Sequence, residues 1–430
     1  MIQTISASQF VKKQRAGIQR KVFDKTEAIV DSVAQKGFAA VAEYTRQFDS
    51  FTLDMQNVKI NKSEFESGAA KLSHVQKASI DKAFSTVEKV QKALAKQALK
   101  ETKVRVNKNG YTAIRPRSIE RIGIYVPGGV APLPSSLLMA GVTARAAGVK
   151  EIVVCTSPNK NGISPAVLYV AKKLGISDIY QIGGAQAIAS MAYGLSGIMK
   201  KVDMVCGPGN VYTAVAKQIV SSRGLVKIDM MAGPSEVLII ADDSARTDYI
   251  AADMLAQAEH GTNSPAVLLT DSKKLAENVC IELEKQLSEL KNNTTARKSI
   301  DDYGAIVLLD DLDQAVKIAN NYAPEHLEVM VQDPEPITRD LANAGAIFVN
   351  TCEAFADYGM SGGNHILPTG GTARFASGLS VYDFIVRTYV EYMNDVEQQA
   401  LSEKTTTFAE LEGLEAHANA AKLRGRGADK

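Results

Sequence analysis

From about residue 121 to residue 350, short apolar runs alternate with segments whose apolar residues recur at helical spacing. This alternation constrains the fold of the chain more than any other feature. Strands that alternate with helices form βαβ units, and such units build a parallel sheet. In the first block we expect strands at Ile122–Val126, Glu151–Cys155, Asp178–Ile182 and Val202–Val205, and helices at Ser135–Ala147, Pro165–Leu174, Ala185–Tyr193 and Val211–Ser221.

The pattern starts again after residue 236, which indicates a second α/β domain in tandem. Residues 1–110 and Val381–Lys430 have mostly helical patterns. The fold class is therefore α/β: two Rossmann-like parallel-sheet domains, a helical N-terminal arm and a small helical C-terminal appendage. In the second block we expect strands at Val237–Ala241, Ala266–Thr270, Ala305–Leu309, Leu327–Val331 and Ala346–Asn350, and helices at Asp248–Ala258, Lys273–Lys291 and Leu312–Asn320.

The charge balance excludes some classes of partner. The 430 residues include 49 basic and 48 acidic side chains, a formal net charge of +1. No global field attracts nucleic acid or an anionic membrane, so we expect neither as a partner. No apolar run approaches the ~20 residues of a membrane span, no signal segment is recognised, and four scattered cysteines do not form a disulfide framework. We therefore expect a cytoplasmic protein.

Three glycine-rich turns follow expected strands of the first block. Ligands of parallel sheets bind outside the carboxyl ends of the strands, and glycine lets the backbone approach a ligand. A dinucleotide or phosphate site is one interpretation. Tight strand-to-helix turns are an equal alternative, because neither G-x-G-x-x-G nor a P-loop occurs. The turns are Pro127-Gly128-Gly129, Gly183-Gly184-Ala185-Gln186 and Gly207-Pro208-Gly209-Asn210.

The second block and the loops that follow it hold most of the histidines. Gln257 and His260 are three residues apart at the end of an expected helix and share a face, which is compatible with metal ligation. Adjacent Glu325 and His326 can act as a pair of acid and base groups only where the chain bends, because neighbouring residues of a strand point to opposite faces. Each feature is also compatible with a purely structural role.

Two further regions contribute polar side chains. Residues 355–371 form a long loop rich in glycine that contains Asp357 and His365, and long loops in compact domains are often functional. Glu412 and His417 lie in the C-terminal helical region and would be solvated in isolation. Nitrogen and carboxylate donors from Gln257, His260, Asp357 and His417 would suit zinc better than calcium or magnesium. The residues alone indicate an α/β enzyme and leave open whether it uses a metal or a nucleotide.

The stretch from Ile228 to Glu236, IDMMAGPSE, continues through Asp253 to the QAEH sequence that ends at His260. It resembles the signature region of the histidinol dehydrogenase family. The resemblance covers nearly the whole chain. The other matching motifs are Tyr125-Val126-Pro127-Gly128-Gly129, Gly183-Gly184-Ala185-Gln186-Ala187-Ile188, Gly207-Pro208-Gly209-Asn210, Pro324-Glu325-His326-Leu327, Asn364-His365-Ile366-Leu367-Pro368-Thr369 and Glu412-Gly413-Leu414-Glu415-Ala416-His417.

The resemblance implies an enzyme that oxidises L-histidinol to L-histidine through the aldehyde, with two NAD and one zinc ion per subunit, in the last step of histidine biosynthesis. It implies that His326 is the base and that Glu325 activates water. It also implies a homodimer in which His417 and Glu412 cross the interface. By the same resemblance, the zinc ligands are Gln257, His260, Asp357 and His417, the other substrate contacts are Ser235, His326, His365 and Glu412, and the NAD contacts are Tyr125, Gln186 and Asn210.

The expected domain organisation follows the same resemblance. Residues 1–22 form an N-terminal arm, and residues 121–235 form the NAD-side domain. The C-terminal appendage covers residues 381–430. The domain with the metal and catalytic residues is assembled from residues 23–120 and 236–380.

This chain departs from the family pattern at two places, with Ala356 where a glycine is usual and with one extra residue between Asp357 and His365. Two alternatives to histidinol oxidation are a related dehydrogenase for another small alcohol and a non-catalytic metabolite-binding protein.

Overall fold

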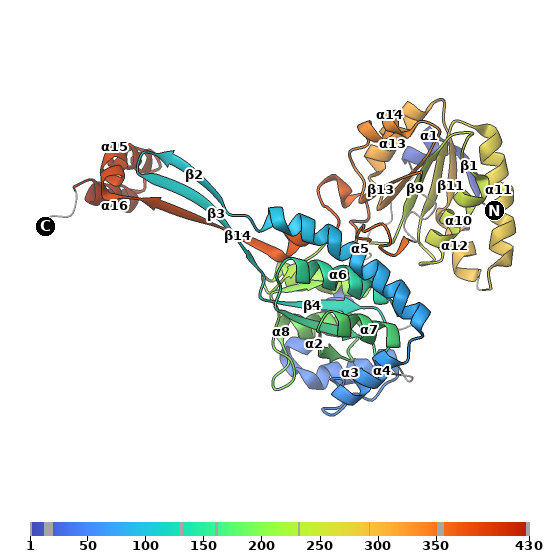
Figure 1. Cartoon of the computed structure of the whole chain (residues 1–430), viewed down its shortest axis with the longest axis horizontal. Helices are drawn as coiled ribbons and strands as arrows, with labels where there is room; N and C mark the ends of the chain where they lie inside the picture. Colours follow the sequence, from blue (N-terminus) through green and yellow to red (C-terminus); the bar gives the residue numbers. More distant parts are fainter. Residues whose placement is uncertain are drawn as a thin grey trace.

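The computed structural model describes residues 2–12, 20–128, 132–159, 162–230, 233–291, 293–350 and 357–426. Gly129, Met231, Ala232 and Ala356, which the sequence analysis singled out, lie outside the described residues. Figure 1 shows two domains, each built on a parallel sheet, and an extended arm that ends in two short helices. The α/β fold class with two parallel-sheet domains is thereby confirmed.

The first parallel sheet has the strand order β6-β5-β4-β7-β8. The chain runs outward from β4 to β6 and then returns to the other side of β4 with β7, so the order reverses between β4 and β7. Buried Ile122, Ile124 and Val154 belong to the core beneath one face of this sheet. The strands are β4 (Arg121–Val126), β5 (Glu151–Thr156), β6 (Asp178–Tyr180), β7 (Met204–Cys206) and β8 (Lys227–Ile228), and the helices between them are α6 (Pro134–Ala146), α7 (Pro165–Lys173), α8 (Gly184–Tyr193) and α9 (Val211–Ser222).

The second parallel sheet repeats this arrangement, with the order β1-β11-β10-β9-β12-β13 and a reversal between β9 and β12. The sequence analysis missed β1, which pairs with β11 and therefore builds the start of the expected N-terminal arm into this sheet. The strands are β1 (Gln3–Ser6), β9 (Val237–Ala241), β10 (Ala266–Thr270), β11 (Ala305–Leu308), β12 (His326–Met330) and β13 (Ala346–Val349), and the helices are α1 (Ala7–Lys12), α10 (Thr247–Ala258), α11 (Lys273–Glu289), α12 (Thr294–Tyr303), α13 (Leu312–Tyr322) and α14 (Pro334–Asp340).

The N-terminal helices pack on the first sheet and its helices, which differs from the expected grouping of residues 23–120 with residues 236–380. Val30 and Val41 share a core with Ile188 of α8, and Val87 shares another with Leu138 of α6. Amphipathic spacing shows that a helix has an apolar face but does not identify what covers that face. The helices are α2 (Arg20–Lys36), α3 (Phe38–Asp49), α4 (Lys62–Ala70) and α5 (His74–Ala98).

The arm is an antiparallel sheet of order β14-β3-β2, and it projects away from both domains (Figure 1). The C-terminal helices are as expected, but a strand precedes them where a helical pattern had been inferred, because residues 385–393 pair along the whole of β3. Residues 102–118 likewise form strands at the end of a region expected to be helical. The elements are β2 (Thr102–Asn107), β3 (Gly110–Ser118), β14 (Ile385–Met393), α15 (Asp395–Leu411) and α16 (Glu415–Gly425), with short 3-10 turns at Thr372–Arg374 and Val381–Phe384.

A buried ion pair fixes the turn that follows β7. The Lys217 ammonium donates to the Asp229 carboxylate at 2.7 Å and to the Gly207 carbonyl at 2.9 Å, and the Gly207 N–H donates to Asp229 at 2.8 Å. Both side chains are buried. Gly207 has a φ of +111°, and an added Cβ would lie 2.2 Å from the Tyr125 carbonyl oxygen. The turn therefore holds one backbone conformation at the carboxyl edge of the sheet.

We predict that Lys217→Met destabilises the fold by about 3–5 kcal/mol, because it leaves the buried Asp229 carboxylate without a counter-ion. Chemical denaturation followed by circular dichroism measures this loss. Lys298→Met is the matched control, because it removes a lysine whose ion pair with Asp302 is exposed. Equal denaturation midpoints for the two variants would contradict the prediction.

Candidate active site

Glu325 and His326 meet at the start of β12, where the chain bends. Ala323 ends α13 with a φ of +48°, and Pro324 and Glu325 then lead into the strand. The Glu325 Oε2 lies 3.6 Å from the His326 Nδ1. The bend thus brings together two neighbouring side chains that a straight strand would point to opposite faces.

The backbone of Glu236, which directly precedes β9, positions both of these side chains. Its N–H donates to the Glu325 Oε2 at 3.0 Å, and its carbonyl oxygen accepts from the His326 N–H at 3.2 Å. The same carbonyl oxygen lies 3.1 Å from the His326 Nδ1. A carbonyl can only accept, so this contact favours the tautomer with the proton on Nδ1, which leaves the lone pair on Nε2.

Burial sets the charge state of the pair. It lowers the pKa of His326 to about 3 and raises the pKa of Glu325 well above its usual range. The imidazole is therefore neutral at physiological pH, as a general base must be. Both shifts have the same main cause, which is that burial disfavours the charged form of each group.

The Glu236 side chain joins this centre to a loop near residue 370. Its carboxylate accepts from the Tyr322 hydroxyl at 3.2 Å and from the Gly370 N–H at 3.1 Å. Ser235, a predicted substrate contact, is half-buried immediately before it. Sequence reasoning assigned no role to Glu236, although it ends the signature stretch IDMMAGPSE.

Helix α10 places Gln257 at the level of His326. It connects the parallel strands β9 and β10 and therefore runs antiparallel to them and to β12. Carboxyl groups of Asp253 on α10 and Glu328 on β12 lie within hydrogen-bonding range of each other. Gln257 is four residues after Asp253, an advance of about 6 Å along the helix. His326 is two residues before Glu328, a distance of about 6.6 Å along the strand. Because the helix and the strand run in opposite directions, Gln257 and His326 are displaced from that contact toward the same edge of the sheet by nearly equal distances.

Gln257 is fully buried, and within the described chain neither its Oε1 nor its Nε2 has a hydrogen-bond partner. Burying an amide without hydrogen-bond partners costs free energy, unless a ligand or an ion interacts with its polar atoms. The position and the unsatisfied oxygen fit a metal ligand. This observation supports the predicted role of Gln257 more directly than its spacing from His260 does.

His260, His326 and His365 gather around this point. A positive charge on His260 or on His365 would lower the pKa of His326 further, and Asp357 acts on His365 in the opposite sense. Burial lowers the pKa of His365, and its buried Nε2 has no hydrogen-bond partner among the residues described. Neighbouring Asn364 donates to the Thr143 hydroxyl of α6 at 3.2 Å, which attaches this loop to the first domain.

Asp357 holds a turn in its own loop. Its carboxylate accepts from the Gly359 N–H at 2.6 Å, from the Ser361 N–H at 3.0 Å and from the Ser361 hydroxyl. Across the described residues, no group of three or more His, Cys, Asp or Glu side chains is arranged as a metal site. His417 in α16 and Glu412 after α15 lie at the far end of the arm (Figure 1). Within a single chain, His417 and Glu412 therefore lie apart from the other predicted site residues.

The predicted NAD contacts lie at the carboxyl edge of the first sheet. Tyr125 is near the end of β4, and its hydroxyl accepts from the Gly184 N–H at 3.2 Å. Gln186 in α8 is buried, and neither its Oε1 nor its Nε2 has a hydrogen-bond partner in the described structure. Asn210 caps α9 and accepts from two backbone N–H groups, at 3.0 and 3.2 Å. Asn210 therefore has a structural role whether or not a ligand binds.

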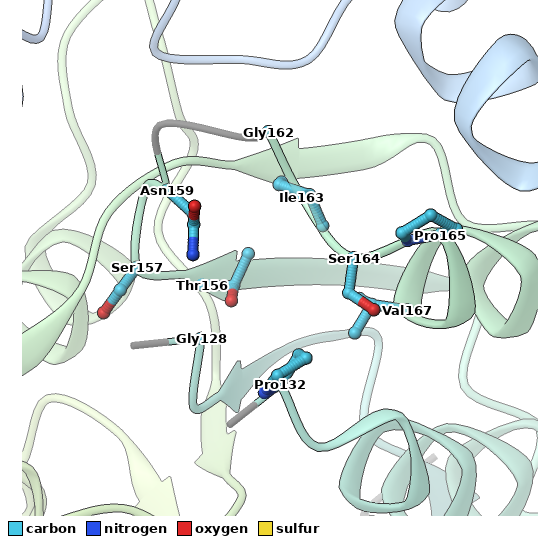
Figure 2. A pocket seen from close by; sticks show the side chains of 10 residues that line it. All are labelled: Gly128, Pro132, Thr156, Ser157, Asn159, Gly162, Ile163, Ser164, Pro165 and Val167. Carbon is cyan, nitrogen blue, oxygen red and sulfur yellow. The ribbon is translucent and has the colours of Figure 1, made fainter. Parts of the chain in front are cut away.

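A cavity of about 230 Å³ opens at the carboxyl ends of β4 and β5 (Figure 2). None of the three predicted NAD contacts lines it, and sequence reasoning missed the residues that do. The available signal was the polar Thr156-Ser157 pair directly after an expected strand. Figure 2 shows the lining residues, which come from the segment after β4, from the end of β5 and the segment after it, and from the start of α7: Gly128, Pro132, Thr156, Ser157, Asn159, Gly162, Ile163, Ser164, Pro165 and Val167.

No helix among the described residues is long and apolar enough to cross a membrane.

Comparisons with known proteins identify the family to which the chain belongs. The sequence pattern of the histidinol dehydrogenase family matches residues 12–425. Histidinol dehydrogenase of Geobacillus kaustophilus is 41% identical over 416 residues, which cover 95% of this chain and 96% of that protein. The protein of the same name from Methanopyrus kandleri is 39% identical over 410 residues, 94% of each chain. The crystal structure of histidinol dehydrogenase from Elizabethkingia anophelis superposes with a TM-score of 0.91 at 33% identity, and covers 100% of this chain and 99% of that one. The chain therefore belongs to the histidinol dehydrogenase family, a family of oxidoreductases.

Proposed function

We propose that this protein oxidises L-histidinol to L-histidine through the aldehyde, with zinc as its bound metal and NAD as the electron acceptor, in the last step of histidine biosynthesis. The single observation that carries the site assignment is the buried, unsatisfied carboxamide of Gln257 at the level of His326. Family membership supports the reaction.

The residues that would hold each group are distributed over the fold. Gln257, His260 and Asp357 of one chain, with His417 of the partner subunit, are the proposed ligands of one zinc ion per subunit. When bound, zinc would hold the substrate in place, one of the recognised roles of a catalytic metal. Tyr125, Gln186 and Asn210 are the proposed NAD contacts, and NAD would accept one hydride in each oxidation. The proposed substrate contacts are Ser235, Gln257, His260, His326, Asp357, His365, Glu412 and His417, the last two from the partner subunit.

His326 acts as the base of the alcohol oxidation. Its Nδ1 faces the Glu236 carbonyl, so its Nε2 lone pair can take the proton from the substrate hydroxyl oxygen as a hydride leaves the carbon that carries this hydroxyl. The resulting imidazolium is costly in a dry site, and the Glu325 carboxyl, 3.6 Å from Nδ1, is placed to stabilise it when ionised. The product of this step is the aldehyde.

Glu325 acts in the second oxidation, which consumes water. Its raised pKa makes the ionised carboxylate a strong base, able to take a proton as the water oxygen bonds to the aldehyde carbon. A second hydride then leaves that carbon and the carboxylate product forms. The Glu236 N–H holds the Glu325 Oε2 in place throughout.

The arm supports assembly as a homodimer. It exposes apolar side chains that a solvated monomer would leave in water, among them Tyr389 of β14 at 69% and Leu411 at the end of α15 at 80% exposure. Exposed patches of this kind are typical of protein interfaces. If a second copy of the chain packs on the arm, Glu412 and His417 of the first copy come close to the active site of the second copy. We propose the cytoplasm as the location, since Cys155 and Cys206 are free thiols.

The first test is the yield of NADH per L-histidinol consumed by the purified protein. We expect two NADH per substrate, with activity lost to a zinc chelator and restored by zinc. One NADH with free aldehyde would show that the second oxidation fails. Absence of NADH with zinc and NAD present would contradict the proposal, and faster turnover of an alcohol without an imidazole would favour a different substrate.

Variants at the catalytic pair should separate the two oxidations. His326→Asn should slow alcohol oxidation by about 10²–10⁴-fold through loss of the base. Glu325→Gln should slow oxidation of added aldehyde more than oxidation of alcohol. Single-turnover kinetics with each substrate measures both effects. His74→Asn, an exposed change, is the control. Normal turnover by His326→Asn, or equal losses in both steps for Glu325→Gln, would refute these roles.

Mixing two inactive variants tests whether His417 acts across the interface. In a mixed dimer of His326→Asn and His417→Ala subunits, one site combines an intact His326 with an intact His417 only if His417 crosses over. We expect activity to return after joint refolding, up to about half that of a wild-type dimer for each mixed dimer formed. No recovery in verified mixed dimers would place His417 in its own subunit's site or outside the site.

A further inference from the structure

Asp253 and Glu328 are buried carboxyl groups that the chemistry above does not use. They are 9% and 1% exposed and lie within hydrogen-bonding range of each other. In the described structure no hydrogen-bond donor reaches the Asp253 Oδ2 or either Glu328 carboxyl oxygen. Two carboxylates at this range repel each other, so the contact requires a shared proton. Burial raises the pKa of both groups, which agrees with one of them remaining protonated.

The contact between Asp253 and Glu328 connects α10 to β12. It joins the face of α10 that carries Gln257 to the face of β12 that carries His326. One helical turn from Asp253 and two strand residues from Glu328 are nearly equal advances, as described above. The contact therefore fixes the position of α10 relative to β12 along the direction of the strand.

Stability alone does not require this pair. Apolar side chains of similar volume can replace a buried polar pair with little loss or with a gain in stability, because they avoid the cost of desolvation. Removing both carboxyl groups together thus separates a stabilising role from a positioning one.

We infer that Asp253 and Glu328 are positioning residues, whose proton-sharing contact holds the Gln257 ligand level with the catalytic His326. The inference rests on the zinc role proposed for Gln257. Groups that orient a metal ligand affect metal affinity even though they do not touch the ion.

The test compares a variant that keeps the contact with one that removes it. In Glu328→Gln, the new amide N–H can donate to the Asp253 carboxylate without a shared proton. In the double variant Asp253→Leu with Glu328→Met, both polar groups are gone. Four quantities are measured on the full-length protein: the thermal midpoint, the zinc dissociation constant by chelator competition, kcat and KM, and amide hydrogen exchange over residues 250–260.

We expect Glu328→Gln to bind zinc nearly as the wild type does. The double variant should keep or raise the thermal midpoint, bind zinc about 10–100-fold more weakly, and exchange faster at the last turn of α10. Zinc affinity of the double variant close to that of the wild type would overturn the inference. Equal weakening in Glu328→Gln would also overturn it. If the double variant does not fold, Glu328→Met alone takes its place.

The same experiment separates failure of this inference from failure of the proposed function. A wild-type protein without zinc affinity would overturn the metal assignment, and hydrogen exchange would then decide the positioning role by itself. Faster exchange at residues 255–258 in the double variant but not in Glu328→Gln supports that role. Unchanged exchange in both variants rules it out.

Discussion

The backbone of one residue, Glu236, holds Glu325 and His326 of the candidate site in place. Its N–H and its carbonyl oxygen bind the side chain of Glu325 and the backbone of His326, so a single peptide segment before β9 sets the positions of both groups. This is possible because β9 and β12 are parallel neighbours at the point where the strand order reverses. Glu325 and His326 are therefore attached to interior strands of the second sheet, and their altered pKa values follow mainly from the burial that this position imposes.

The strands that the sequence predicted best are those buried on both faces. Val237–Ala241 and Ala266–Thr270 have the predicted bounds, because a short continuous apolar run has few alternatives in an α/β chain. β14 was missed, because its side chains are mostly exposed and its partner, β3, is more than 260 residues away in sequence. The partners of α2–α5 were also mistaken. Helical periodicity reports an apolar face, whereas the choice of surface that covers it depends on the whole fold.

The family resemblance predicts which residues form the candidate site, but it does not predict how they are arranged in space. The level placement of Gln257 and His326 depends on the direction of α10 relative to β12, which only the sheet topology establishes. The cap formed by Asn210 was not foreseen. A bend was expected to be necessary for the Glu325–His326 pair, but its position at Ala323 was not. His326 lies at the amino end of its strand, whereas the rule for parallel sheets led us to look at carboxyl ends. The cavity of the first sheet lies where that rule expects a ligand, whereas the Glu325–His326 pair of the second sheet lies at the opposite, amino edge.

The position of β1 has a consequence for synthesis of the chain on the ribosome. Gln3 pairs with Ala305, so the first strand to emerge must wait for a partner about 300 residues later. At about 5–20 residues per second, this delay lasts about 15–60 seconds. During that interval the first parallel sheet and its covering helices can fold, whereas β1 has no strand to pair with because β11 has not yet been made. The first strand made and its partner β11 can therefore pair only after most of the chain has been synthesised.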